Sequence, residues 1–218
     1  MQDTEFINLW KSHDKQLQES LQLNMQNAIA ITHLKVRTFL YSMQPVKIFT
    51  IIIGVLWVVF VDMIIVSAFN YASPFFLISA IIQVLLTKAA LIIYLYQLVL
   101  IYQTDISEPI VKTQERLSLL QSSTLWVTRL LILQLPVWTT FYISGKMFAD
   151  VNFALIAMQV IITGIFTIAA AWLFVNINIS NKDKKWFRLL FEGKEWTPVM
   201  RSLDLLEQVK NFKNEDQH

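Results

Sequence analysis

Residues 48–69 read IFTIIIGVLWVVFVDMIIVSAF, an almost unbroken apolar run that contains one acidic residue. Three more apolar runs follow at about residues 75–102, 124–143 and 151–179. The hydrocarbon core of a bilayer is roughly 30 Å thick, so a helix that rises about 1.5 Å per residue crosses it in about 20 residues. The runs therefore predict an all-α fold, in which residues 46–180 form an integral membrane four-helix bundle between two polar tails, 1–45 and 181–218.

The composition agrees with this prediction and excludes several kinds of site. Of the 218 residues, 55% are hydrophobic and 16% are charged, so the chain has more apolar residues than a soluble domain of this size needs for its core. It has no cysteine, which excludes disulfides and thiolate metal sites. Positive and negative charges are nearly balanced, with a net charge of +2, so nucleic acid is not an expected partner. Membrane lipids are an expected partner because of the apolar runs.

Lysine and arginine flank the four runs unevenly. They lie before the first run, between the second and third, and after the fourth: Lys35, Arg37, Lys47, Lys112, Arg116, Lys182, Lys184, Lys185 and Arg188. The opposite loops, 70–74 and 144–150, are short and carry little charge. Positive charge is retained on the cytoplasmic side of a membrane, so we expect both termini to be cytoplasmic.

The N-terminal tail is predicted to be an amphipathic helix. It has no glycine or proline from residue 4 to residue 43, and Pro45 is expected to break the helix before the membrane. Apolar residues and one asparagine recur at coiled-coil spacing: Trp10, Leu17, Leu21, Asn24, Ala28 and Ile31. Polar residues interrupt this seam at both ends. The helix is therefore predicted to self-associate, to lie on the membrane or to pack on the other tail.

The C-terminal tail is predicted to contain a second amphipathic helix. Thr197 and Pro198 are typical of a helix start, and an apolar stripe follows at Val199, Leu203, Leu206 and Val209. Between this helix and the fourth run lie cations beside an aromatic residue: Lys182, Lys184, Lys185, Trp186 and Arg188. We expect these residues to face lipid headgroups, either as an ordinary positive anchor or as a specific lipid site.

The connection between the second and third runs also has helical periodicity. Its apolar residues are Ile106, Ile110, Leu117 and Leu120, and Pro109 suits the first turn of a helix. This hairpin is expected to extend beyond the membrane and to pack on both terminal helices. The third run itself contains Pro136, which is expected to kink it.

Asp62 and Lys88 are the two charged residues deep within the runs. Counted from the short loop that joins the first two runs, they lie about 12 Å and about 20 Å into the membrane, so a lysine side chain can bridge the offset. A charge at this depth is costly unless it is paired or hydrated. The pair is predicted either to fix the register of the two helices or to take part in an ion pathway, for which Gln83, Thr87, Gln134 and Gln159 are the sparse polar neighbours.

The sequence contains no pattern typical of an enzyme. The three histidines, His13, His33 and His218, are far apart in the tails, and the four glycines form no phosphate-binding loop. We therefore expect no catalytic residues, no metal site and no cofactor.

Four motifs resemble an uncharacterised family of four-span inner-membrane proteins from Bacteroidetes. They are Leu9-Trp10-Lys11, Lys47-Ile48-Phe49 with Gly54 and Trp57, the stretch from Ile106 through Pro109 to Gln121, and Asp183-Lys184-Lys185-Trp186. Genes of that family often lie beside sigma factors of the extracytoplasmic-function class. The resemblance implies a multi-pass protein of the bacterial inner membrane with a regulatory role.

Two functions follow as hypotheses. The first is a regulatory or scaffold protein that binds a protein partner through its cytoplasmic helices, and the resemblance implies a sigma factor as this partner. The second is a small oligomeric transporter or channel that uses Asp62 and Lys88. A homo-oligomer is compatible with both hypotheses.

Overall fold

The structure is a computed structural model, and it describes residues 2–104, 110–143, 153–191, 193 and 196–215. The regular structure of these residues is helical: α1 (Gln2–Ala68), α2 (Pro74–Tyr102), α3 (Ile110–Ile132), α4 (Gln134–Thr140), α6 (Phe153–Asn176), the 3-10 helix η1 (Ile179–Asn181), α7 (Lys185–Phe191) and α8 (Thr197–Glu215). Within the described ranges, α1, α2 and α6 are long and apolar enough to cross a membrane. The prediction of an all-α membrane protein is confirmed at that level.

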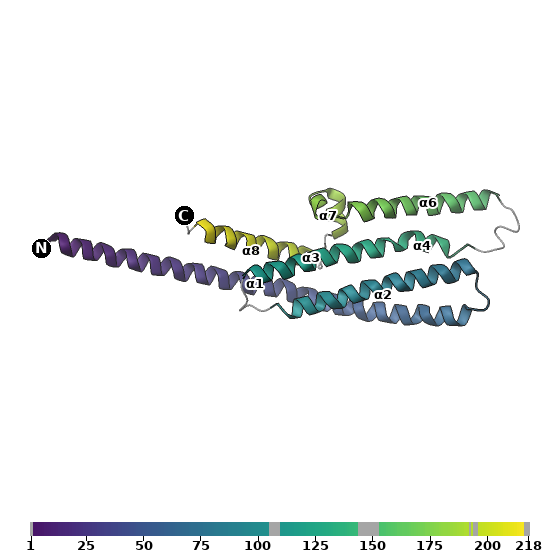
Figure 1. The fold of residues 1–218 in the computed structure, drawn as a ribbon, viewed down its shortest axis with the longest axis horizontal. Coiled ribbons are helices and arrows are strands. Elements are labelled where there is room, and N and C mark those ends of the chain that lie inside the picture. The colour runs from purple at the N-terminus through teal and green to yellow at the C-terminus, as the bar shows by residue number, and fades with distance from the viewer. Residues whose placement is uncertain (1, 105–109, 144–152, 192, 194–195, 216–218) are drawn as a thin grey trace.

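α1 is a single helix of 67 residues that runs through Pro45. The break expected at this proline does not occur, and that prediction is wrong. The proline ring removes the bond that an N–H at position 45 would donate to the carbonyl of residue 41. The neighbouring turns are nevertheless held by packing, because Leu40 and Met43 before the proline and Lys47 after it are buried. The polar tail and the first span are therefore one continuous helix (Figure 1).

α1 and α2 form an antiparallel hairpin joined by a turn at residues 69–73. Ser73 caps α2, because its Oγ accepts a hydrogen bond from the N–H of Phe76 at 3.2 Å. Pro74 takes the first helical position, where no backbone donor is needed. Further along the hairpin the two helices approach closely: a Cβ on Gly54 would lie 2.6 Å from Cδ2 of Leu91. Glycine thus makes room for the Leu91 side chain.

The third predicted span, 124–143, is divided between α3 and α4. α3 ends at Ile132, whose carbonyl would accept a bond from residue 136 in a regular helix, but Pro136 has no N–H to donate. The kink expected at Pro136 is confirmed as an interruption of the helix at Leu133. Neither α3 nor α4 is among the described helices that are long and apolar enough to cross a membrane alone. Three of the four predicted spans are thus supported as single helices.

The helices lie side by side in a row (Figure 1). α2 packs against α1 and against α3 and α4, and α6 packs against α3 and α4 at the outer edge of the row. In α6, Ala170 is the buried residue. The four-helix bundle expected from the sequence is therefore confirmed only as a set of packed helices, and its outer faces on α1 and α6 are open.

A second packing unit lies toward the end of the molecule that carries both termini (Figure 1). α8 begins at Thr197, as predicted, and packs against α1 and α3. The core of this unit joins four helices: Val36, Leu40, Met43, Ile101, Leu117, Leu120, Val199 and Leu206, with Leu203 packed against it. The predicted packing of the hairpin on the terminal helices is confirmed. Ile106, Pro109 and the side chains of Ile110 and Val209 lie outside the described residues.

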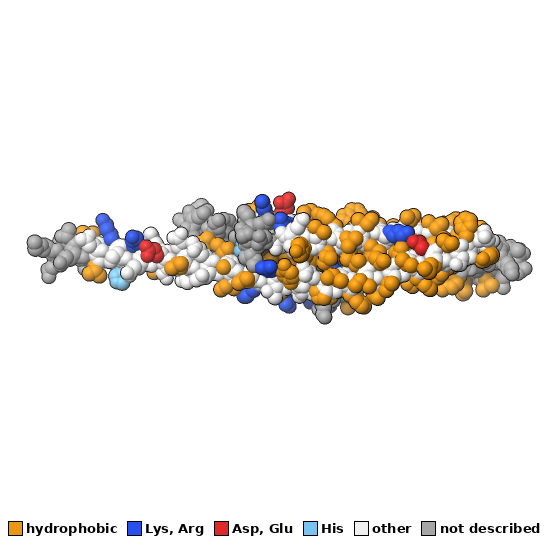
Figure 2. All heavy atoms as spheres, turned by 90° about the horizontal axis from the view of Figure 1, so that it is seen from below, with side chains coloured by type: hydrophobic (Ala, Val, Ile, Leu, Met, Phe, Trp, Pro, Cys, Tyr) orange, Lys and Arg blue, Asp and Glu red, His pale blue; other side chains and the backbone are white. Residues whose placement is uncertain are grey.

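Apolar side chains cover the surface of the helices that form the spans (Figure 2). Residues such as Leu56, Val66, Leu85 and Ile161 are largely exposed there. A contiguous apolar surface of this extent is unfavourable in water, because monomeric soluble proteins rarely expose patches beyond a few hundred Å². The surface fits a lipid environment.

Candidate functional site

Asp62 of α1 and Lys88 of α2 form the predicted ion pair. Lys88 Nζ donates to Asp62 Oδ2 at 3.0 Å. The Asp62 side chain is 45% exposed and the Lys88 side chain is 48% exposed. The pair therefore lies on the outer surface of the hairpin and not between the helices. Basic and acidic side chains in contact interrupt the apolar surface in Figure 2. No other charged residue occurs between positions 48 and 104, so this pair is the one charged site in the first two spans.

Lys47 is the charged residue whose place the sequence did not reveal. Reasoning from the sequence treated it as one of the flanking cations, but its side chain is fully buried. Its Nζ donates to Gln97 Oε1 at 2.5 Å and lies 5.0 Å from the ring centroid of Tyr94. Gln97 Nε2 in turn donates to Ser123 Oγ at 3.1 Å, and Thr124 lies next to it. The cluster joins α1, α2 and α3 where the apolar spans meet the terminal packing unit.

The sequence contained a weak signal for this cluster. Lys47 lies seven residues after Leu40 and four after Met43, on the face of α1 that is buried, so helical periodicity marks it as inward-facing. Its position between the tail and the first span is equally typical of an exposed anchor, and the spacing alone did not decide between the two.

Arg129 ties α3 to the end of α6. Its Nε and Nη2 both donate to the carbonyl of Ile177, at 3.0 and 2.5 Å. The guanidinium carbon also lies 5.1 Å from the ring centroid of Trp126 and 5.7 Å from that of Phe174. The last carbonyls of a helix have no partner inside the helix, so a cation at this position stabilises the end of α6. The guanidinium group is therefore used in contacts within the protein.

Short polar contacts connect the spans along their length. Ser79 of α2 bonds Thr140 of α4 at 2.8 Å, and Gln134 Nε2 of α4 donates to Thr87 Oγ1 of α2 at 3.0 Å. Hydrogen bonds of this kind between helices are common in membrane proteins, where each contributes about 1 kcal/mol. Gln83 is buried in α2. Of the predicted polar neighbours, Thr87 and Gln134 therefore pair α2 with α4 instead of lining a path from Asp62 and Lys88.

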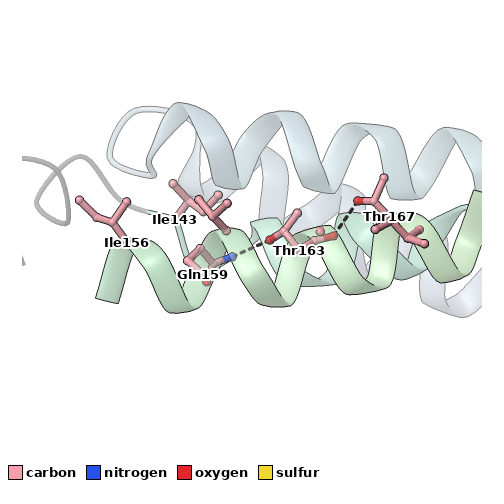
Figure 3. A pocket seen from close by; sticks show the side chains of 8 residues that line it. Ile143, Ile156, Gln159, Thr163 and Thr167 are labelled. Atoms are coloured by element: carbon pink, nitrogen blue, oxygen red, sulfur yellow. Dashed lines mark hydrogen bonds between the residues drawn. The ribbon is translucent and has the colours of Figure 1, made fainter. Parts of the chain in front are cut away.

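A groove of about 390 Å³ runs along α6. Figure 3 shows Gln159, Thr163 and Thr167 following one another along the helix, with Ile143 and Ile156 near one end. Gln159 Nε2 donates to the Thr139 carbonyl at 2.6 Å and to Thr163 Oγ1 at 3.1 Å. These donors are used within the protein, so the groove offers mainly apolar contacts.

The first part of α1 projects beyond the packing unit (Figure 1). We call residues 7–31 the arm. Its predicted seam is exposed: the Trp10 and Leu17 side chains are 70% and 60% exposed, and Leu21 and Ile31 are exposed as well. A weak pair at 4.0 Å, Lys15 with Glu19, lies off the seam. The structure thus leaves this apolar stripe exposed.

The juxtamembrane cations occupy α7 and the turn between η1 and α7. Lys182, Lys184, Lys185 and Arg188 are exposed. Trp186 is half-buried, because its ring packs against Trp172 of α6 at a centroid distance of 5.2 Å. Beneath them lies an aromatic core in which Phe187 stacks on Phe191 at 4.4 Å. The cations are therefore displayed on a rigid aromatic base.

Among the described residues, no group of three or more His, Asp or Glu side chains could hold a metal ion. His13 is exposed and His33 is buried in α1, twenty residues further along the same helix. Burial lowers the pKa of His33 below its usual value of 6.5.

The fold and these sites define a helical membrane protein with an extended helix projecting from it. Comparison of the chain with known protein families, curated proteins and solved structures finds no match. The resemblance to the four-span family of Bacteroidetes stays a prediction.

Proposed function

We propose that this chain is a four-span scaffold protein of the bacterial inner membrane, with both termini in the cytoplasm, and that its arm binds a cytoplasmic protein partner. The observation that carries the proposal is the continuity of α1, a helix of 67 residues whose first part has an exposed apolar seam. An amphipathic helix that docks in a groove of a partner presents its anchors at this spacing.

The geometry weighs against two of the other predicted uses of the arm, which are lying flat on the membrane and packing on the C-terminal tail. Because α1 does not break at Pro45, the arm continues in the direction of the first span, and a helix in that direction does not lie flat on the membrane. At about 1.5 Å per residue, Trp10 lies about 57 Å from Ile48 along the axis. Packing on the C-terminal tail is seen at Val36, Leu40 and Met43, which lie beyond the arm. The arm is thus placed to reach a partner away from the membrane.

A sigma factor of the extracytoplasmic-function class is the partner that the family resemblance implies. Few residues lie at the opposite end of the spans, namely a turn at residues 69–73 and the short stretch of sequence between Ile143 and Phe153. This asymmetry favours a task on the side of the termini. The transporter hypothesis is less supported, because the Asp62–Lys88 pair lies on the outer surface of the hairpin.

Photo-crosslinking tests the proposal in cells. The chain has no cysteine, so Leu17→Cys on the seam and Ser12→Cys on the opposite face of the arm can each carry a thiol-linked photo-crosslinker. We expect a crosslinked partner of defined mass from position 17 and not from position 12. The partner is then identified by mass spectrometry, purified, and its affinity measured with the chain in nanodiscs.

The double variant Trp10→Ala, Leu17→Ala separates binding from folding. Because both side chains are exposed, their removal should leave the melting temperature unchanged and weaken partner binding at least about tenfold, or about 1.4 kcal/mol. An adduct made only of two copies of this chain, or equal affinity of the double variant, would refute the proposal.

A further inference from the structure

We propose that the face of the hairpin that carries Asp62 and Lys88 binds a second copy of this chain, so that the two ion pairs lie against each other across a two-fold axis. The first observation is exposure. The pair is closed at 3.0 Å, yet nearly half of each side chain is open on a surface otherwise formed by apolar residues. Val66, Leu85 and Ile92, about one turn away from the pair, are among these exposed residues.

The second observation is depth. Asp62 lies six residues before the end of α1 at Ala68, which is about 9 Å along the helix, and Lys88 lies fourteen residues after the start of α2 at Pro74, or about 21 Å. Both lie within the apolar spans. Charged groups that face hydrocarbon are incompletely solvated, and this raises their free energy even when they are paired. Contact with a lipid chain is therefore unfavourable for the pair.

The third observation is the arrangement of charge. One cation and one anion side by side form a neutral patch that is complementary to itself, and two-fold symmetry brings identical patches together with opposite signs in register. In the other two apolar runs, 124–143 and 151–179, the one charged residue is Arg129, and its guanidinium group is bonded to the Ile177 carbonyl. A second copy supplies both signs, and its surrounding apolar residues exclude lipid. The inference does not depend on the partner of the arm.

Disulfide trapping in native membranes tests the interface, since the chain is free of cysteine. Ile92→Cys places a thiol one turn from Lys88, and Ile168→Cys on α6 is the matched control. The two isoleucines are 66% and 73% exposed. On mild oxidation we expect Ile92→Cys to give a dimer of twice the chain mass and Ile168→Cys to give several-fold less. Failure of Ile92→Cys to form the dimer, or stronger trapping at position 168, would overturn the proposal.

Complementation shows whether the charges act between copies. In the Ile92→Cys chain, Asp62→Leu or Lys88→Met alone removes both contacts across the axis, so each variant should trap several-fold less dimer. Two differently tagged chains, one with each substitution, restore one contact between copies when they are expressed together, although neither has a pair of its own. Mixed dimers should then exceed either homodimer. Mixed dimers no more abundant than homodimers would show that the charges act within one chain only.

A variant in which the two charges are exchanged tests whether the single variants lose the dimer only because they fail to fold. Asp62→Lys with Lys88→Asp preserves every pair, within and between copies, and should trap dimer to the level of the parent chain. An exchanged chain that accumulates in the membrane but does not trap would also overturn the proposal.

Discussion

Lys47 shows how much a single residue depends on its neighbours. A fully buried ammonium group is expensive unless it is hydrogen-bonded, and here the Gln97 amide oxygen accepts from it while the Tyr94 ring faces it. Gln97 is itself held by Ser123 of α3. One amide thus links the first three helices, and its removal is expected to affect all of them.

The substitution Gln97→Leu is expected to destabilise the protein. It removes the Gln97 amide oxygen as an acceptor for a buried cation, and hydrogen bonds to charged groups contribute about 1.5–3 kcal/mol. We expect a loss of about 2 kcal/mol in the free energy of unfolding, measured by denaturant titration in detergent. The exposed Gln16→Leu in the arm is the control. A loss no larger than that of the control would show that Lys47 does not depend on this amide.

His33 gives the protein a pH dependence of defined sign. Its pKa is lowered by burial, so between its usual value of 6.5 and its lower folded value the unfolded chain binds more protons than the folded one. Stability should therefore fall as the pH drops below about 6.5. Melting curves at about pH 7.5 and about pH 5.5 should show a smaller acid-induced loss for His33→Gln than for the parent chain. His13→Gln, at an exposed site, should behave like the parent.

At the scale of elements, the two prolines within helical segments have opposite outcomes. Pro45 leaves α1 continuous, whereas Pro136 separates α3 from α4. The difference lies in their surroundings. Buried Leu40, Met43 and Lys47 hold the turns around Pro45 against other helices. The helix α4, which contains Pro136, has seven residues, and none of them is buried. Packing compensates for the missing hydrogen bond in the first case.

α6 packs on α3 and α4 at the edge of the row, and Arg129 of α3 is bonded to the chain just after α6. Arg129 is therefore expected to help hold α6 in position. Arg129→Met removes two bonds to the Ile177 carbonyl and the contacts with two aromatic rings. We expect a loss of about 2 kcal/mol and faster hydrogen exchange near the end of α6. Arg188→Met, at an exposed arginine of α7, is the matched control. Unchanged exchange at the end of α6 would contradict a capping role for Arg129.

At the scale of the whole molecule, both chain ends lie toward the same end of the row of helices (Figure 1). The uneven distribution of lysine and arginine predicts that this end is cytoplasmic. A thiol at Tyr71→Cys, in the opposite turn, should react with a membrane-impermeant maleimide in intact spheroplasts. A thiol at Lys184→Cys should react only after the membrane is permeabilised. Labelling of both sites in intact spheroplasts would contradict the topology.

The sequence alone determined the features that depend on neighbours in the chain. Apolar runs of about 20 residues indicate spans whatever their surroundings, because the cost of placing backbone and polar groups in hydrocarbon is local. The apolar stripe of α8, its start at Thr197 and the interruption before Pro136 follow equally from local hydrogen bonding and periodicity. The contact between Asp62 and Lys88 was also predictable, because a five-residue turn fixes the offset of the two helices.

Only the tertiary structure decided which face of each helix meets another. It buried Lys47, placed Arg129 on the end of α6, kept α1 intact through Pro45 and turned the Asp62–Lys88 pair to the outside. In each case the sequence allowed two alternatives of similar local free energy. A charged residue can face lipid or protein, and a helix can break or stay intact at a proline. The choice is made by contacts between residues far apart in the chain, which no local pattern contains.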